Sequence, residues 1–86
     1  MPYIRKDDRV YYDVTLGDHS PATGPGELNF QITQLCLQYM SQEEINYQRY
    51  NDIIGVLESC KLEFYRRAVA PYEAKKIEEN GDVYNV

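Results

Sequence analysis

The fold is decided by the stretch from Tyr47 to Asn80, which reads YQRYNDIIGVLESCKLEFYRRAVAPYEAKKIEEN. On a helix that turns about 100° per residue, one set of its apolar side chains falls within an arc of about 120°. This stripe consists of Tyr50, Ile53, Ile54, Leu57, Cys60, Phe64, Ala68 and Tyr72. The pattern predicts one long helix over residues 46–80, followed by a short tail at 81–86. Pro71 lacks a backbone N–H and its ring collides with the preceding turn, so we expect the helix to kink or break there.

A second, shorter helix is predicted over residues 25–40. Pro25 suits the first helical position, where its missing N–H costs nothing, and Glu27 places a carboxylate near the positive end of the helix. Apolar residues then recur at helical spacing, namely Leu28, Ile32, Leu35 and Tyr39. Asn46 is the best candidate to cap the long helix that follows.

The N-terminal arm, residues 1–24, is compatible with two conformations. Residues 10–16 are rich in β-branched and aromatic side chains, which favours a short strand. Asp7 and Asp8, however, are suited to cap a short helix. Propensity places the strand slightly ahead, and a loop rich in glycine and proline follows at 17–26. At 86 residues, the whole chain is too short for more than one domain.

The composition narrows the classes of protein to consider. The chain carries 9 Lys and Arg against 14 Asp and Glu, a net charge of −5, which argues against a protein that coats duplex DNA. It has no apolar run near the ~20 residues of a membrane-spanning helix. Charges in MPYIRKDDR occupy the place where a signal peptide needs apolar residues, so we expect a cytoplasmic protein. The two cysteines and one histidine form no zinc-binding spacing, and we expect neither a metal nor a cofactor.

The length of the helix predicted over residues 46–80 indicates self-association. A helix to Asn80 spans ~50 Å, whereas a compact chain of this size has a diameter of roughly 30 Å. The helix therefore overhangs any globule that the rest of the chain forms, and its overhanging half has the wider apolar surface. A second copy of the chain is the simplest cover, which predicts a mainly α fold of hairpin-like protomers assembled as a homo-oligomeric bundle. The residues expected at this interface are Tyr50, Ile54, Leu57, Leu62, Phe64 and Val69.

Positive charge is concentrated in residues 61–76, where five basic residues stand against two acidic ones, a net charge of +3. Arg66 and Arg67 are suited to grip an anion while a neighbouring tyrosine stacks on a base. In a symmetric oligomer such groups converge from two chains, which suits a small symmetric ligand such as a cyclic nucleotide. A simpler interpretation stays open: basic residues favour the last turns before a helix break and pair with acids one turn away. The residues of this candidate ligand site are Lys61, Tyr65, Arg66, Arg67 and Tyr72.

No set of residues in the sequence forms a recognisable catalytic site. Cys36 and Cys60 lie on or beside the apolar stripes, where buried cysteines act as small hydrophobic residues. His19, the only histidine, has no nucleophile elbow or oxyanion signal near it. Pairs of glutamates occur without a third ligand at metal spacing. We therefore expect that the protein is not an enzyme.

The chain resembles a family of small uncharacterised helical proteins encoded by tailed bacteriophages and prophage-bearing bacteria, in the stretches PGELNFQITQLCLQY, NDIIGVLESCKLEFYRR and VAPYEAKKIEENGDVY. The resemblance covers about residues 1–6 and 25–84. It implies a mainly helical fold and a phage setting in the bacterial cytoplasm, and it implies no particular activity. In the family a charged helix usually precedes PGEL; here VYYDVTLGDHSPATG takes that place, and Gly24 replaces the threonine that completes a capping box.

Three functions from different classes stay open at this point. The first is a phage accessory protein, an oligomeric binding module that sequesters a small anionic ligand such as a cyclic nucleotide immune signal. The second is an interaction protein that binds and inhibits a host protein. The third is a structural or morphogenetic component of the phage. The basic cluster, the oligomer argument and the analogy with other small helical phage proteins favour the first.

Overall fold

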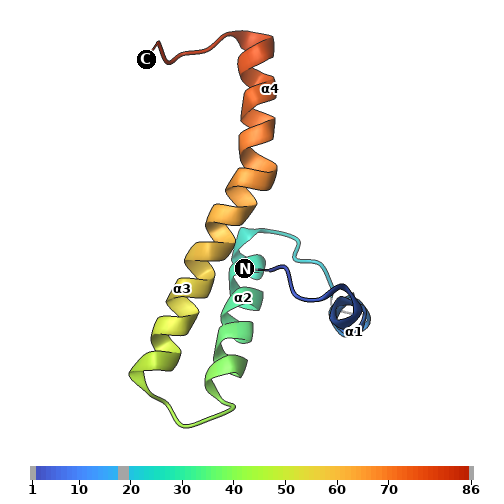
Figure 1. Ribbon diagram of the computed structural model, residues 1–86, viewed down its shortest axis with the longest axis vertical. Coiled ribbons are helices and arrows are strands. Elements are labelled where there is room, and N and C mark those ends of the chain that lie inside the picture. Colours follow the sequence, from blue (N-terminus) through green and yellow to red (C-terminus); the bar gives the residue numbers. More distant parts are fainter. Residues whose placement is uncertain (1, 18–19, 86) are drawn as a thin grey trace. The chain divides into compact units, whose positions relative to one another are not determined.

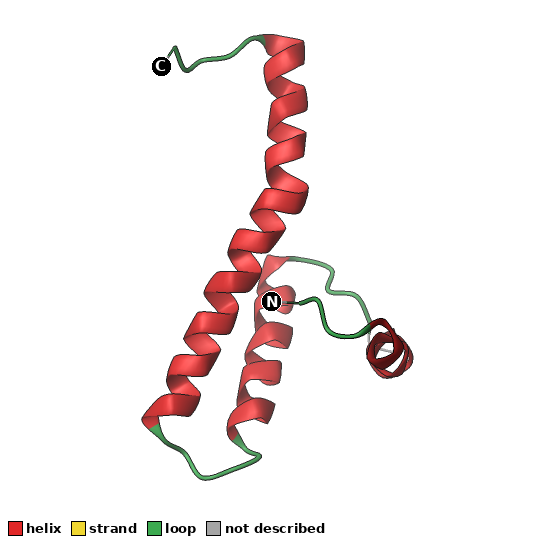
Figure 2. Cartoon of the chain, in the orientation of Figure 1, coloured by secondary structure: helices red, strands yellow, loops and turns green. Residues whose placement is uncertain are grey.

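A computed structural model describes residues 2–17 and 20–85, and within these residues the regular structure is helical throughout, with no strand (Figures 1 and 2). This confirms the mainly α fold. In chain order the elements are the helices α1, α2 and α3, a turn of π-helix η1 and the helix α4. Their bounds are Lys6–Gly17, Pro25–Met40, Tyr47–Phe64, Tyr65–Val69 and Ala70–Asn80. The last three follow one another directly and together form the long helix.

Helix α1 (Lys6–Gly17) occupies the segment for which a strand was slightly favoured, so that prediction is wrong. The carbonyl of Arg5 accepts hydrogen bonds from the N–H groups of Asp8 and Arg9, at 3.0 and 3.2 Å. Asp7 and Asp8 place negative charge at the positive end of the helix. A preference for strand is realised only against a neighbouring strand, and the described chain offers none. A helix therefore does precede PGEL in this chain, although its sequence departs from the charged helix that is usual in the family.

Helix α2 (Pro25–Met40) begins and ends as its sequence predicts. Gly24 stands at the N-cap in an extended conformation and has no side chain to cap the helix, while Pro25 follows as the first helical residue. Before the helix, the hydroxyl of Thr23 donates a hydrogen bond to Oε2 of Glu27 at 2.9 Å. At the other end the N–H of Ser41 closes the last turn on the carbonyl of Leu37 at 3.0 Å.

The long helix runs from Tyr47 to Asn80 without interruption (Figure 2). Asn46 caps it as predicted, since its Oδ1 accepts a hydrogen bond from the N–H of Arg49 at 2.9 Å. The helix does not break at Pro71. Instead the turn before it widens to the π form, with the N–H of Ala70 bonded to the carbonyl of Tyr65, five residues earlier. The wider turn gives the proline ring the room that an α turn denies it.

The chain comprises two units, one of Pro2–Ile54 and a second that begins at Gly55. The first holds α1, α2 and the start of α3; the second holds the rest of α3, η1 and α4. Among the described side chains, only Met40 and Arg49 are buried, both in the first unit. In the second unit α4 ends at Gly81, which has φ 88° and closes the helix with a 2.8 Å hydrogen bond to the carbonyl of Ile77. None of the described helices combines the length and the apolar character needed to cross a membrane.

Candidate functional site

The candidate ligand residues centre on η1, which contains three of the five: Tyr65, Arg66 and Arg67. A π turn holds one more residue than an α turn, so every residue after it is set back by about 100° relative to a continuous α-helix. Residues seven apart share a face on an α-helix; across η1, residues eight apart do. Single π turns of this kind are frequent at functional sites.

Tyr65 shows the effect of this extra residue. Its hydroxyl donates a hydrogen bond to Oε1 of Glu73, eight residues later. That hydrogen bond, followed by the negative charge of the Glu73 carboxylate, raises the pKa of Tyr65. The tyrosine ring is half exposed and is anchored at its hydroxyl end. The π turn thus brings an acidic partner to Tyr65 that helical spacing in the sequence does not indicate.

The two arginines of η1 differ in their pairing. Arg66 donates from Nη2 to Oε2 of Glu63, one turn earlier, and forms an ion pair with it. Arg67 is exposed and makes no hydrogen bond or ion pair with any residue that the structure describes. Its guanidinium therefore presents its full set of N–H donors to an incoming group.

The two remaining candidates also have local partners. Lys61 pairs with Glu58 at 3.2 Å. The Nζ atom of Lys76 lies over the ring of Tyr72, 5.5 Å from the ring centroid. Within the described residues, no hydrogen bond, ion pair or ring interaction joins two of the five candidates. The simpler interpretation, in which bases pair with acids one turn away, thus describes Lys61 and Arg66 but does not describe Arg67.

The described residues at and after η1 include cationic side chains that can engage an anion. Arg67 and Lys75 are the basic residues of the 61–76 segment that have no partner within the described chain. A guanidinium engages carboxylate or phosphate through two parallel hydrogen bonds, and an ammonium adds a point charge. Tyr72, in the first turn of α4, exposes 62% of its surface. The described residues contain no group of His, Cys, Asp and Glu side chains that could hold a metal ion, and His19 lies outside the described residues.

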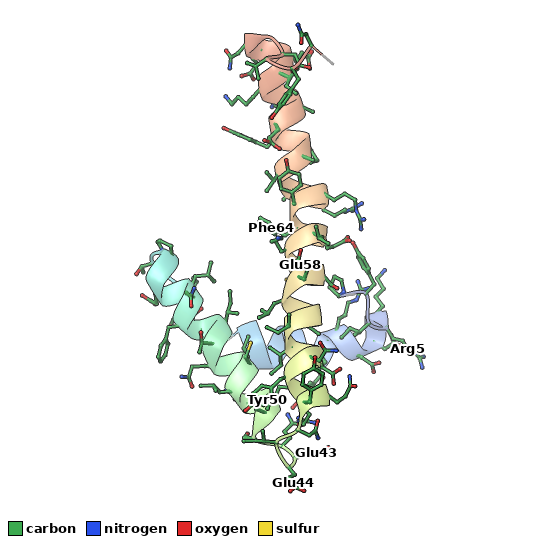
Figure 3. All side chains as sticks on the ribbon, turned by 90° about the vertical axis from the view of Figure 1, so that its left-hand side faces the viewer. Arg5, Glu43, Glu44, Tyr50, Glu58 and Phe64 are labelled. Carbon is green, nitrogen blue, oxygen red and sulfur yellow. The ribbon has the colours of Figure 1, made fainter. Side chains whose placement is uncertain are left out.

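The residues predicted at an oligomer interface all lie on the long helix and leave apolar surface open to solvent. Ile54 and Phe64 are each 66% exposed, and Figure 3 shows Tyr50 and Phe64 projecting from α3. Cys60, which was expected to be buried, is exposed, and Cys36 is half-buried. Of the six predicted interface residues, Tyr50, Ile54, Leu57, Leu62 and Phe64 are exposed and Val69 is half-buried.

The sequence analysis did not identify Arg49, which is only 9% exposed. Its guanidinium lies 4.2 Å from the centroid of the Tyr39 ring and donates to the Tyr39 carbonyl. Its Nη1 also reaches Oε2 of Glu43 at 3.4 Å, while its buried Nε has no partner in the described chain. A cation in the first turn of a helix opposes the helix dipole, and that unfavourable position was the one signal in the sequence. Arg49 fixes the loop between α2 and α3.

Comparison with known proteins yields one match. No curated protein and no solved structure matches the chain. A family model does, over residues 1–83, and this range includes every helix and the π turn. The resemblance to an uncharacterised family is thereby confirmed. The chain belongs to the family described as a domain of unknown function, DUF6899.

Proposed function

We propose that this chain is a non-enzymatic, homo-oligomeric binding module, which assembles through its long helix and holds a small anionic ligand at η1. A cyclic nucleotide is the ligand class that we favour. The observation that carries the proposal is the combination, on one helix, of an exposed apolar stripe with an unpaired arginine in a π turn.

The exposed area supports self-association. Ile54 and Phe64 are each 66% exposed, and Leu62 is 57% exposed. Large apolar side chains that recur at helical spacing and stay open to solvent mark a surface for association in soluble proteins.

The pairing of the charges supports anion binding. In the segment around η1, the acids neutralise Lys61, Arg66 and Lys76 locally, while Arg67 and Lys75 keep their charge free. An arginine held on a helix binds phosphate or carboxylate with less loss of freedom than one on a loop, because the backbone is already ordered. The ring face of Tyr72 opposite Lys76 supplies a surface on which a nucleobase stacks.

The proposal includes a biological setting, which is the bacterial cytoplasm during phage infection. The resemblance described above implies a phage setting, and we propose that setting for the chain itself. A small oligomer that binds a cyclic nucleotide in the bacterial cytoplasm would remove a signal of the host immune system. The chain would then act as a sponge during infection.

Isothermal titration calorimetry with a panel of cyclic mono- and dinucleotides, and with inorganic phosphate, tests the binding proposal. We expect at least one cyclic nucleotide to bind and Arg67→Ala to weaken it by about tenfold or more, the size of one charge-assisted pair. Arg5→Ala is the matched control, since it removes the same charge from a side chain that also has no partner in the described chain. Equal losses in the two variants, or no binding across the panel, would contradict the anion site.

A second candidate is an interaction protein that binds and inhibits a host protein. Helix α2 favours it, because Phe30 and Leu37 are 62% and 55% exposed on a helix outside the long one. This function predicts a host polypeptide that co-purifies with the chain, stays bound to Arg67→Ala, and is lost from Phe30→Asp. Retention of that polypeptide by Phe30→Asp would contradict this candidate.

A further inference from the structure

We propose that two copies of the chain pair antiparallel along their long helices, with the centre of the pair near residue 59. This inference rests on the oligomer of the proposed function and adds its orientation. The occupant of the exposed apolar stripe is thus a second copy of the same chain in reversed direction, so that η1 of one copy lies beside the first turns of α3 in its partner.

The positions of the apolar residues along the helix indicate where the centre of the antiparallel pair lies. In an antiparallel pair around a two-fold axis, facing residues lie at equal distances on either side of one midpoint. The midpoint of Tyr50 and Val69 falls at about residue 59, and that of Ile54 and Phe64 falls at the same place. Val69 belongs to this set because η1 holds one extra residue. In a continuous α-helix Ala68 would lie on the stripe at this level; with the extra residue, Val69 takes that position.

The distribution of charge along the helix favours the antiparallel over the parallel orientation of the two copies. Residues 61–76 carry +3. Across the proposed centre they lie at the level of the start of α3 in the partner, where Arg49 and Asp52 leave no net charge, and of the loop before it, which contains Glu43 and Glu44. The antiparallel order thus sets each +3 segment against a part of the partner that has no excess of positive charge.

A parallel pair would have the reverse effect. It would set the +3 segment of one copy against the same segment of the other, with the unpaired Arg67 of each chain at the same level. Like charges held side by side oppose association. At the centre, Glu58 and Lys61 already pair at 3.2 Å within one chain. Only the antiparallel order also places Lys61 of each copy at the level of the partner's Glu58.

The orientation changes the expected form of the ligand site. In an antiparallel pair the two η1 turns lie on opposite sides of the centre, about 20–25 Å apart along the helix. The two turns therefore form two separate sites, each beside the start of α3 of the partner. We expect one anion per chain, in place of one anion shared by two converging arginines.

Pulsed electron–electron double resonance tests the orientation, because it measures the distance between the spin labels at residue 78 of the two copies. The variant carries Glu78→Cys with Cys36→Ser and Cys60→Ser, so that one thiol per chain is labelled. Glu78 is exposed and has no partner in the described chain, which makes it a benign position. Helical rise predicts a separation of about 50–60 Å between the two labels of an antiparallel pair. A parallel pair would place them less than about 30 Å apart.

The outcomes separate this inference from the proposed function. A distance of about 50–60 Å supports the antiparallel pair. A distance below about 30 Å overturns the orientation and leaves the oligomer intact. Absence of dipolar modulation at micromolar concentration means a monomer, and overturns both. In the same cysteine-free background, a mixture of Tyr50→Cys and Val69→Cys should form the mixed disulfide, whereas Tyr50→Cys homodimers would contradict the orientation independently.

Discussion

Arg49, in the first turn of α3, closes the end of α2 by binding Tyr39 twice. Its guanidinium donates to the carbonyl of Tyr39 and lies 4.2 Å from the centroid of the Tyr39 ring. The hydroxyl of Tyr39 in turn donates to Oδ2 of Asp52 at 3.2 Å. A cation at the last carbonyls of a helix also interacts favourably with the helix dipole. This cluster gives the first unit a polar anchor in place of a large apolar core.

We therefore expect Arg49→Ala to destabilise the protein by about 1–3 kcal/mol, since it removes a charge-assisted hydrogen bond and a largely desolvated cation–π contact. Chemical denaturation at equal protein concentration measures this loss. Glu43→Gln is the control within the same cluster: Glu43 is 73% exposed, so its ion pair contributes about 0.5 kcal/mol or less. Equal effects from the two variants would contradict the anchoring role of the Tyr39 contacts.

The hydrogen bond between Tyr65 and Glu73 leads to a prediction about pH. Because Glu73 raises the pKa of Tyr65 in the folded chain, the folded state holds the phenolic proton more tightly than the unfolded state does. The stability from this pair is therefore complete below the ordinary tyrosine pKa of about 10 and is lost as the pH rises through the higher folded value. Ultraviolet titration of tyrosine ionisation should show a raised pKa for Tyr65, identified by comparison with Tyr65→Phe.

Two substitutions should abolish that raised pKa for different reasons. Glu73→Gln removes the carboxylate, so the pKa of Tyr65 should fall toward its ordinary value. Pro71→Ala removes the cause of the π turn, and in a continuous α-helix Glu73 would no longer share the face of Tyr65. Pro71→Ala should thus lower the same pKa while the carboxylate is retained. An unchanged titration in Pro71→Ala would contradict the link between the proline, the π turn and this hydrogen bond.

Two glycines in the second unit should respond to alanine in opposite directions. Gly81 has φ 88° at the end of α4, a conformation that side chains rarely adopt, so Gly81→Ala should cost about 1–3 kcal/mol. Gly55 lies within α3 with open space around its missing Cβ, so Gly55→Ala should stabilise the helix by about 0.5–1 kcal/mol. Thermal unfolding of both variants at one concentration tests the pair. A stabilised Gly81→Ala would contradict the C-cap described here.

The apolar stripe predicts which charges break the oligomer. Leu57→Asp places a carboxylate on the stripe and should weaken association by about tenfold or more. Val56→Asp introduces the same charge one residue away, on another face of the helix, and should have little effect on association. Sedimentation velocity over a concentration series compares the two. If Val56→Asp dissociated the oligomer and Leu57→Asp left it intact, the interface would lie on the face of Val56, which would contradict the proposed stripe.

The sequence was sufficient to predict α2 and the long helix, because regular apolar spacing agrees with strong start signals at Pro25 and Asn46. It was misleading for α1, where β-branched and aromatic residues indicated a strand that has no neighbour in the described chain. Pro71 signalled a disturbance in the helix. The π turn that resolves it could not be predicted, because an apolar pattern read at about 100° per residue does not reveal one extra residue in a turn.

The candidate site was predictable as a set of residues but not as a geometry. The spacing in the sequence indicated the basic cluster with its tyrosines, and three of its members lie in η1. It did not indicate which cations are neutralised, since that depends on rotamers: Arg66 meets Glu63 while Arg67 has no partner within the described chain. Arg49 was missed because its contacts join two helices through a loop, and only the folded chain brings them together.

Native mass spectrometry of the full chain at micromolar concentration tests the central claim, self-association through the long helix, most directly. We predict a species at a small multiple of the 10.1 kDa chain mass, which Leu57→Asp converts toward the single chain and Val56→Asp does not. An added mass of a few hundred daltons that disappears on denaturation would also identify the anionic ligand. A wild-type chain found only at 10.1 kDa would contradict the oligomer.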